Sequence, residues 1–427
     1  MISDIYELFL KSSGVCTDSR QIHQGNLFFA LKGPNYNANE FAEDALHKGA
    51  SYVVIDDPAY KKDERYLVVD DTLKALQELA MFHRNNLNIP FIGITGSNGK
   101  TTSKELINTV LSQGYNTLAT KGNLNNHIGV PLTLLSINSK IEIAIIEMGA
   151  NKIGDIAELC ELAKPTHGII TNIGKAHLEG FGGFEGVIRG KSELYNYLIR
   201  HNGTAFINSQ NPILANMGKR FENPIYYPSK GDYLYCKFIK ADPYVVFEEE
   251  HGTVIETNLI GSYNFENIAA ALCIGKYFKV IPEKAYSAVK NYIPANNRSQ
   301  VTKKISNMIL LDAYNANPSS MKVAIDNLAG VKAEKKVLIA GDMYELGITT
   351  EEEHRKIGQL AKEKGFYQVF FCGKNMKWAY EEFPEANYFE NKAGLKEYLK
   401  NTPLKNCFVL IKASRGMAME EITDCIE

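Results

Sequence analysis

The stretch GITGSNGKTT, from Gly93 to Thr102, decides how this chain is interpreted. The residues before it, 89–95, are apolar enough for a buried strand, and residues 101–111 have helical spacing. A buried strand, a glycine-rich turn and the N-terminus of a helix form a ready anion site, because free backbone N–H groups and the helix dipole face the same point. The sequence therefore predicts a phosphate-binding loop.

The side chains of the loop have separate expected roles. Three glycines would let the backbone aim its N–H groups at phosphate oxygens, namely Gly93, Gly96 and Gly99. Lys100 would neutralise the terminal phosphates, and the Thr101 hydroxyl would hold Mg²⁺. The strict motif has its first glycine where Ile94 stands here, so the loop is a variant. The alternative, a glycine-rich turn with an exposed lysine, fits the flanking strand and helix less well. The expected nucleotide contacts from the loop are Gly96, Ser97, Asn98, Gly99, Lys100, Thr101 and Thr102.

Length and composition restrict the class of protein. A chain of 427 residues is too long for one ordinary domain. With 45% hydrophobic and 22% charged residues it has the composition of a soluble globular protein, and a net charge of −2 gives no reason to expect a nucleic-acid or membrane partner. Seven scattered cysteines argue against a disulfide framework. We find no signal peptide or membrane-spanning run, and expect a cytoplasmic monomer.

The chain divides into three predicted α/β domains, covering residues 1–88, 89–297 and 298–427. The polar run 83–88 is the expected first linker, and IPANNR at 293–298 marks the second junction. The middle domain would have a mainly parallel sheet, interrupted by an antiparallel insertion at 226–258. The last domain would be a Rossmann-like, doubly wound α/β unit. The expected strands are 26–31, 52–55, 66–69, 91–95, 143–148, 167–171, 308–311, 336–340, 368–371 and 407–411. The expected helices are 40–48, 73–84, 101–111, 319–328, 351–362, 393–399 and 417–426.

Three polar side chains follow strands of the predicted central sheet. Glu147 lies at the end of one strand, Asn172 ends another, and His177 lies just beyond it. In open α/β sheets the ligand lies at the carboxyl ends of the strands, so we expect Lys100, Glu147 and His177 to converge. A carboxylate and an imidazole beside phosphates would form a Mg²⁺ site. Alternatively, Glu147 is a solvated charge and His177 a plain loop residue.

Taken together, these segments resemble the Mur ligases, the ATP-dependent amide-forming enzymes of peptidoglycan precursor synthesis. The resemblance covers essentially the whole chain. It rests on TGSNGKTT, on GNLNNHIGVPLTLL from Gly122, on EMGAN, on NIGKAHLEGFG, on GKSELY from Gly190 and on GSYNFENIAAA from Gly261. It implies ATP contacts at Asn267, Arg298 and Asp312, although Tyr263 replaces the usual histidine. It also implies substrate contacts at Asn123 and Asn126.

The N-terminal run TDSRQIHQGNLFFALKG, from Thr17, is similar to the family's uridine-nucleotide module, in which Ser19 and Arg20 would meet the uridine and diphosphate. Two departures reduce what can be transferred. NANEF, from Asn37, replaces a common aspartate-glycine-histidine run. Ala413 replaces a usual glycine in KASR, which weakens the expectation for Lys412 and Arg415.

Three further segments resemble one branch of the family, whose amine substrate is D-Ala-D-Ala: DAYNANPSSM, GDMYELG and IKASRGMAME. The resemblance implies that ATP phosphorylates the terminal carboxylate of UDP-N-acetylmuramoyl-tripeptide, and that the D-Ala-D-Ala amine attacks the acyl phosphate. Asn315 and Asn317 would contact substrate. The competing interpretation makes them turn-forming asparagines before Pro318.

The resemblance implies two Mg²⁺ sites. Thr101 and Glu147 would hold the first. His177 and Lys191, the latter carrying a carbamate formed with CO₂, would hold the second. The catalytic set would then be Lys100, Glu147, His177 and Lys191. Without the resemblance, Lys191 would be interpreted as a solvated helix lysine.

Three rival functions remain open. A sister ligase that adds the third amino acid typically carries an Asp-Asn-Pro-Arg run, which is absent here. An enzyme like folylpolyglutamate synthase shares the ATPase core without the uridine-nucleotide module. A non-catalytic nucleotide-binding protein would not need Lys100, Glu147, His177 and Lys191 to be intact.

Overall fold

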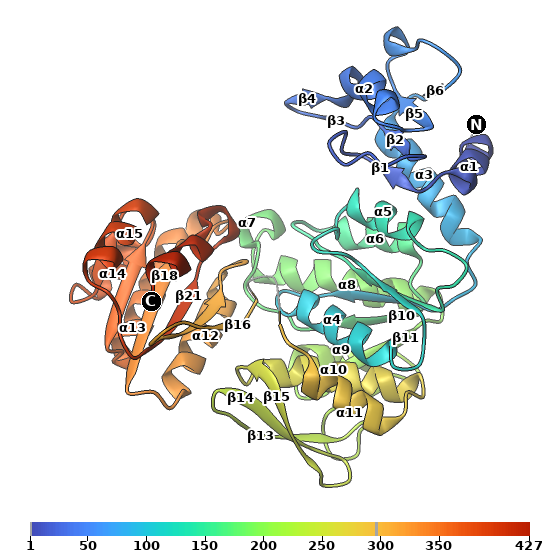
Figure 1. Cartoon of the computed structure of the whole chain (residues 1–427). Coiled ribbons are helices and arrows are strands. Elements are labelled where there is room, and N and C mark those ends of the chain that lie inside the picture. The colour runs from blue at the N-terminus through green and yellow to red at the C-terminus, as the bar shows by residue number, and fades with distance from the viewer. Residues whose placement is uncertain (1, 295–297) are drawn as a thin grey trace.

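The computed structural model describes residues 2–294 and 298–427, and its elements form three bodies with separate sheets (Figure 1). Part of the predicted junction 293–298, residues 295–297, lies outside the described residues. The domain limits at 88 and 297 therefore stay predictions. Over the described residues, no helix combines the length and apolarity that crossing a bilayer requires. All seven cysteines are free.

The N-terminal body contains a four-stranded parallel sheet of order β1-β2-β5-β6, with helices on both faces. Its strands are β1 (Val15–Cys16), β2 (Leu27–Phe29), β3 (Lys32–Gly33), β4 (Tyr36–Asn37), β5 (Tyr52–Ile55) and β6 (Tyr66–Val68). Its helices are α1 (Ile2–Lys11), η1 (Ala38–Phe41), α2 (Ala42–His47), η2 (Pro58–Tyr60) and α3 (Thr72–Asn85). The sequence analysis did not predict α1. The other expected elements are present with shifted ends.

The predicted linker at 83–88 is wrong at its start. Helix α3 continues to Asn85, and both His83 and Arg84 are buried. Arg84 donates to the carbonyls of Ala163 (2.7 Å) and Lys164 (2.8 Å) at the end of α6 (Asp155–Ala163), where a cation is favoured by the helix dipole. The polarity of His83 and Arg84 suggested that their side chains are exposed to solvent. In the structure these side chains connect the first body to the second.

The central body contains a six-stranded, fully parallel sheet of order β12-β11-β10-β7-β9-β8. Its strands are β7 (Phe91–Thr95), β8 (Thr117–Ala119), β9 (Ile143–Glu147), β10 (His167–Ile170), β11 (Thr204–Asn208) and β12 (Ile225–Tyr227). Its helices are α4 (Lys100–Leu111), α5 (Gly129–Leu135), α6, α7 (Leu178–Phe181), α8 (Phe184–Arg200), α9 (Pro212–Gly218), α10 (Asn264–Tyr277) and α11 (Pro282–Asn291).

Both faces of this sheet are covered, which explains why its strands are apolar throughout. In β9, Ile143 and Ile145 belong to the core under α4, α10 and α11, whereas Ala144 and Ile146 belong to the core under α5, α6 and α8. The second core continues into the N-terminal body through Leu76 and Leu79 of α3. The first two bodies therefore share one hydrophobic core.

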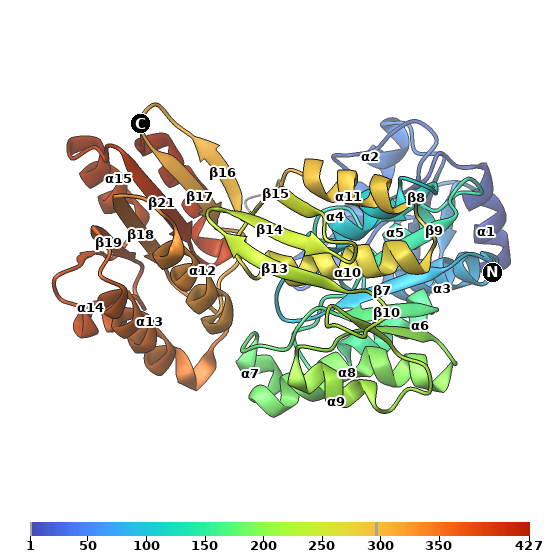
Figure 2. The ribbon, with the colours of Figure 1, turned by 90° about the horizontal axis from the view of Figure 1, so that it is seen from below.

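The predicted antiparallel insertion is present as a three-stranded sheet of β13 (Cys236–Ala241), β14 (Tyr244–Glu249) and β15 (Val254–Ile260). It begins later than the predicted residue 226, because residues 225–227 form β12 and pair in parallel with β11. Figure 2 shows this sheet beside α10, on the side facing the C-terminal body.

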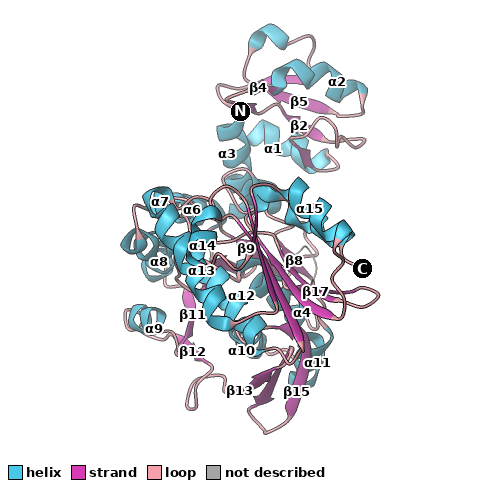
Figure 3. Ribbon diagram, turned by 90° about the vertical axis from the view of Figure 1, so that its left-hand side faces the viewer, coloured by secondary structure: helices cyan, strands magenta, loops and turns pink. Residues whose placement is uncertain are grey.

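The C-terminal body has the predicted doubly wound form, with sheet order β16-β17-β21-β18-β19-β20 and one antiparallel pair at β16. Figure 3 shows α12 and α13 to one side of this sheet and α15 to the other. The strands are β16 (Gln300–Lys303), β17 (Met308–Asp312), β18 (Lys335–Gly341), β19 (Gln368–Cys372), β20 (Asn387–Phe389) and β21 (Cys407–Lys412). The helices are α12 (Pro318–Gly330), η3 (Gly347–Thr349), α13 (Thr350–Lys364), α14 (Lys377–Glu382), α15 (Lys392–Asn401), η4 (Arg415–Met417) and η5 (Met419–Cys425). The α-helix predicted at 417–426 is wrong, because that stretch forms the short 3₁₀ segments η4 and η5.

Candidate active site

A cavity of about 500 Å³ lies between the central and C-terminal bodies, where strand ends from both sheets meet. Glu147 and Asn172 reach it from β9 and β10, and Asp312 and Lys412 reach it from β17 and β21. The predicted site residues in its wall are Ser97, Asn98, Gly99, Lys100, Thr101, Thr102, Asn123, Glu147, His177, Asn267, Arg298, Asp312, Asn315 and Asn317. The structure thus brings together most of the residues that the sequence singled out.

Two of the three loop glycines are required by the backbone. Gly96 has φ +146°, and a Cβ there would lie 2.0 Å from Thr171 Oγ1. Gly99 has φ +76°, and a Cβ would lie 2.7 Å from Asn267 Oδ1. The expected role of Gly93 is wrong, since Gly93 lies inside strand β7, where an added Cβ would lie 3.1 Å from Leu194 of α8. Gly93 therefore serves close helix packing and not the turn.

Lys100 folds back over its own loop. Its ammonium donates to the carbonyls of Gly96 (2.7 Å) and Ser97 (3.4 Å). Burial lowers the pKa of Lys100 to about 8, with the Glu147 carboxylate opposing that shift and Arg298 adding to it. A buried ammonium with only carbonyl partners is well placed for an anion.

Glu147 is a buried carboxylate whose two oxygens have different surroundings. Its side chain is 1% exposed, and Oε1 accepts hydrogen bonds from Thr101 Oγ1 (3.2 Å) and Asn125 Nδ2 (2.8 Å). Among the described residues, Oε2 has no hydrogen-bond partner, and Lys104 Nζ lies 3.9 Å from it. A buried, incompletely paired carboxylate beside a hydroxyl suits a hard divalent cation such as Mg²⁺.

The predicted second metal site has a different arrangement. His177 Nδ1 pairs with Glu345 of the C-terminal body. Lys191 is 1% exposed, so it is not a solvated helix lysine, and its Nζ has a long 3.5 Å contact to the Ala150 carbonyl. Burial lowers the pKa of Lys191 well below its ordinary value, and the charge of Lys100 adds to the effect. Among the described residues, no three His, Cys, Asp or Glu side chains form a metal cluster.

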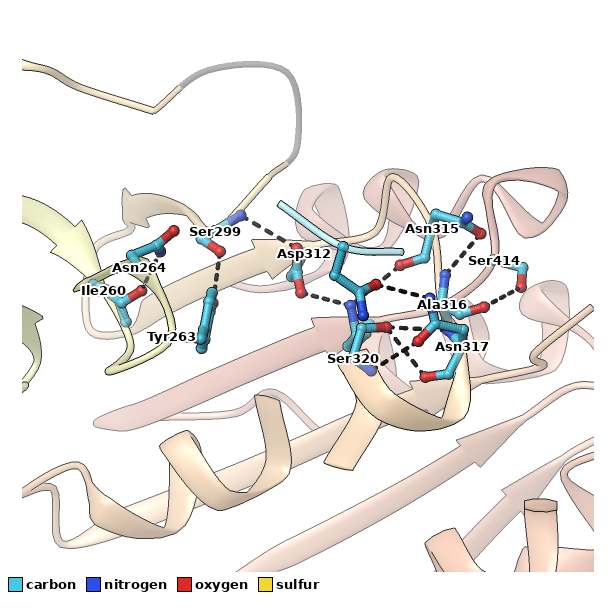
Figure 4. A network of polar contacts seen from close by, with 12 residues as sticks. Ile260, Tyr263, Asn264, Ser299, Asp312, Asn315, Ala316, Asn317, Ser320 and Ser414 are labelled. Carbon is cyan, nitrogen blue, oxygen red and sulfur yellow. Dashed lines mark hydrogen bonds and ion pairs between the residues drawn. The ribbon is translucent and has the colours of Figure 1, made fainter. Parts of the chain in front are cut away.

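On one side of the cavity, asparagines join α10 to the phosphate-loop helix. Asn267 Oδ1 accepts from Ser103 Oγ (2.9 Å), and Asn267 Nδ2 donates to Asn264 (2.9 Å). Tyr263, in place of the family's histidine, shares a 2.7 Å hydrogen bond with Ser299, whose backbone N–H donates to Asp312 (Figure 4).

On the C-terminal side, Asp312 pairs with the buried Lys412 at 2.6 Å, and Lys412 also donates to the Asn315 carbonyl. Asn317 forms a capping box at the start of α12 with Ser320 (Figure 4). It also donates to Asn98 Oδ1 of the phosphate loop at 2.8 Å. Asn317 therefore has both the local structural role that its position before proline suggested and a place in the cavity.

Five predicted residues do not line the cavity: Gly96, Asn126, Lys191, Ser19 and Arg20. Asn126 Oδ1 accepts the N–H groups of Ile128 and Gly129, which fixes the start of α5. Arg20, in the N-terminal body, has an 84% exposed side chain that pairs with Asp18.

Three further residues shape the site: Asn125 and Lys104, which the sequence did not single out, and Asn172, for which it indicated a strand end but no contact. Asn125 holds Glu147, and Asn172 grips the Asn98 backbone through both its carbonyl and its amide group. Lys104 lies four residues after Lys100 on α4, so helical spacing could have placed it on the same face. Asn125 lacked such a signal, because it is one of three asparagines that stand close together in NLNN.

Family models match nearly the whole chain. The Mur ligase family catalytic domain matches residues 11–84, the Mur ligase middle domain 94–275, and the Mur ligase glutamate ligase domain 297–415. The chain belongs to the Mur ligase family.

Relatives within the family agree with this assignment. The UDP-N-acetylmuramoyl-tripeptide–D-alanyl-D-alanine ligase of Bacillus subtilis is 36% identical, over 97% of this chain and 93% of that protein. The same enzyme of Escherichia coli is 33% identical, with 97% and 93% covered.

Solved structures match as well. MurF from Acinetobacter baumannii superposes with a TM-score of 0.88 at 27% identity, covering 99% of this chain and 98% of that one. MurF from Thermotoga maritima in complex with ADP has a TM-score of 0.84 at 26% identity, with 98% and 97% covered.

Proposed function

We propose that this Mur ligase joins D-Ala-D-Ala to UDP-N-acetylmuramoyl-tripeptide at the expense of ATP. The observation that carries the proposal is the cavity between the central and C-terminal bodies, in which a phosphate loop faces polar strand ends of the other body. Relatives at 33–36% identity, which carry the name of this ligase, support the choice of substrates.

The chemistry explains why a phosphate loop is needed. A carboxylate is a poor electrophile, so the terminal carboxylate of the tripeptide first attacks the γ-phosphorus of ATP and ADP leaves. The amine of D-Ala-D-Ala then attacks the acyl carbon, loses a proton and expels inorganic phosphate. Phosphoryl transfer depends on alignment and charge neutralisation, which the loop N–H groups and Lys100 supply.

We assign the first Mg²⁺ to Thr101 and Glu147. The free Oε2 of Glu147, buried beside the Thr101 hydroxyl, fits this ion. When bound, the cation would neutralise phosphate charge. Asn125 and Lys104 would hold the carboxylate in place, since Asn125 hydrogen-bonds Oε1 and Lys104 lies behind Oε2.

A second Mg²⁺ and the carbamate on Lys191 remain part of the proposal. Lys191 is buried beside Ala150, a residue that lines the cavity. Its ammonium has a long hydrogen bond to the Ala150 carbonyl and lies 5.1 Å from the Phe181 ring. That environment suits a lysine modified by CO₂ better than a permanently charged one. A carbamate would give the position a negative charge, as a cation site requires.

The nucleotide-sugar would bind to the N-terminal body through Ser19 and Arg20, and the muramoyl peptide would extend past Asn123 and Asn126. Arg20 has an exposed guanidinium available for a diphosphate. Substrates linked to UDP and the use of ATP are consistent with a cytoplasmic enzyme.

A product assay tests the proposal. Purified protein with Mg²⁺-ATP should convert the tripeptide nucleotide and D-Ala-D-Ala into a pentapeptide nucleotide, identified by mass spectrometry, with one phosphate released per product. Addition of single amino acids with refusal of the dipeptide would assign the chain to the sister ligase. Hydrolysis of ATP without either co-substrate would instead indicate a nucleotide-driven switch.

A further inference from the structure

The loop between β10 and α7 is held by the C-terminal body at several points. The Lys175 backbone N–H donates to Ser319 Oγ of α12 at 2.8 Å. The preceding residue, Gly174, lies close to the same side chain, because an added Cβ would be 2.9 Å from the Ser319 oxygen. The backbone of this loop therefore packs directly against the first turn of α12.

An ion pair strengthens this contact. Lys175 Nζ lies 2.8 Å from Glu353 Oε1 on α13, and the Glu353 side chain is 6% exposed whereas that of Lys175 is 45% exposed. Glu353 also meets Lys356 at 3.1 Å, but that partner lies on its own helix. Of these two cations on Glu353, only Lys175 connects two bodies.

The same loop is tied to the phosphate loop. Ser97 Oγ donates to the Gly174 carbonyl at 3.0 Å and accepts from the Gly174 N–H at 2.9 Å. A continuous path of contacts thus runs from Glu353 through Lys175 and Gly174 to Ser97. A movement of the C-terminal body that displaces Lys175 would therefore also displace Ser97 of the phosphate loop.

We propose that Lys175 is a positioning residue, whose ion pair with Glu353 latches the C-terminal body over the phosphate loop while the acyl phosphate is present. The inference rests on the proposed ligase function. Water that enters the site can hydrolyse an acyl phosphate before the amine reacts, so a latch that keeps the two bodies together protects the intermediate and holds Ser97 in position.

A double-mutant cycle tests the latch. Lys175→Met and Glu353→Gln should each lower kcat/KM for D-Ala-D-Ala by about three- to tenfold, as expected for a partly exposed charged hydrogen bond. The double variant should be no worse than either single variant, because both remove the same interaction. A double variant whose loss equals the product of the two single losses would overturn the proposal.

A matched control separates the latch from the charge on Glu353. Lys356→Met removes the other cation from the same carboxylate without crossing between the bodies, and should leave kcat/KM unchanged. A loss equal to that of Lys175→Met would overturn the proposal. The ratio of phosphate released to pentapeptide formed should rise above one in Lys175→Met and not in Lys356→Met, because a loosened site admits water. A ratio equal to that of the wild type would count against the latch.

Small-angle scattering tests the separation of the two bodies without requiring catalysis. With Mg²⁺ and ADP, Lys175→Met should have a larger radius of gyration than the wild type, while Lys356→Met should match the wild type. Equal radii in all three proteins would overturn the latch. A wild-type enzyme that forms no pentapeptide nucleotide would overturn the proposed function. The scattering experiment would still test whether the Lys175–Glu353 contact holds the two bodies together.

Discussion

The two junctions of this molecule are built in opposite ways. The first joins the N-terminal and central bodies through a continuous hydrophobic core, with Arg84 sealed into it over the ring of Phe91 at 3.7 Å. The second joins the central and C-terminal bodies mainly through polar contacts around a cavity, such as Asn317 to Asn98 and Lys175 to Glu353, with Ile260 of β15 as an apolar contact in the core of the C-terminal body. Separating the first exposes apolar surface to water, whereas separating the second exchanges hydrogen bonds with water. We infer that the first junction is structural and the second can open and close.

The largest effect is expected at the polar junction, from Lys100→Ala. Loss of one preorganised donor to transferring phosphate should lower turnover roughly 100-fold or more. Binding of the UDP-sugar, measured by calorimetry, should be nearly unchanged because its proposed site lies in the N-terminal body. Turnover close to the wild-type value would contradict the phosphate-loop assignment. It would also contradict the proposal that the polar junction contains the active site.

Lys191→Ala should have the next largest effect, about 10- to 100-fold on turnover, as for loss of a group that supports a metal site. Acetate could enter the vacated space and replace the carbamate oxygens, restoring part of the rate in a concentration-dependent way. Lys191→Arg is the control, because it fills the space with a fixed positive charge and should not be rescued. A fully active Lys191→Ala enzyme in CO₂-depleted buffer would rule out the carbamate.

At the apolar junction the expected effect is on stability. Arg84→Met keeps an apolar stem but leaves the carbonyls of Ala163 and Lys164 without their donor, which should cost about 2 kcal/mol of unfolding free energy. Chemical denaturation measures it. Arg200→Met is a matched control, since Arg200 also lies over a ring, that of Tyr197, but its side chain is 61% exposed. Equal stability losses in both variants would contradict the special role of Arg84.

The sequence predicted one junction better than the other. The polar cavity could be foreseen, because strand ends of parallel sheets converge and Lys100, Glu147 and Asp312 each follow a clear apolar strand. The apolar junction was mistaken for a linker, because His83 and Arg84 are polar and their partners, carbonyls at Ile137, Ala163 and Lys164, leave no mark in the sequence. Hydrophobic periodicity reports which face is buried, but not which polar side chain finds a backbone partner.

Contacts between bodies were the least predictable part of the site. The sequence placed His177 beside a metal, and the structure pairs it with Glu345, which comes from a body whose orientation no local pattern encodes. In the same way, Asn126 was expected at the substrate, while its neighbour Asn125 is the residue that holds Glu147. Which asparagine of NLNN contacts Glu147 depends on the exact path of the loop.

The smallest expected effect concerns acid stability of the apolar junction, through His83. Its Nε2–H donates to the Ile137 carbonyl at 2.8 Å, which leaves Nδ1 to accept from the Tyr6 hydroxyl at 3.2 Å. Burial lowers the pKa of His83, and the bond to Ile137 opposes that shift. The unfolded chain therefore binds a proton near pH 6.5 before the folded chain does, and stability present above about pH 6.5 is lost as the pH falls toward the lower folded pKa. For one group the slope is at most about 1.4 kcal/mol per pH unit. His83→Gln should flatten the dependence of the unfolding free energy on pH by up to that amount, while other buried histidines contribute equally in both proteins. An unchanged slope would mean that His83 has the same pKa in the folded and unfolded chains, and that water reaches the first junction more freely than its packing indicates.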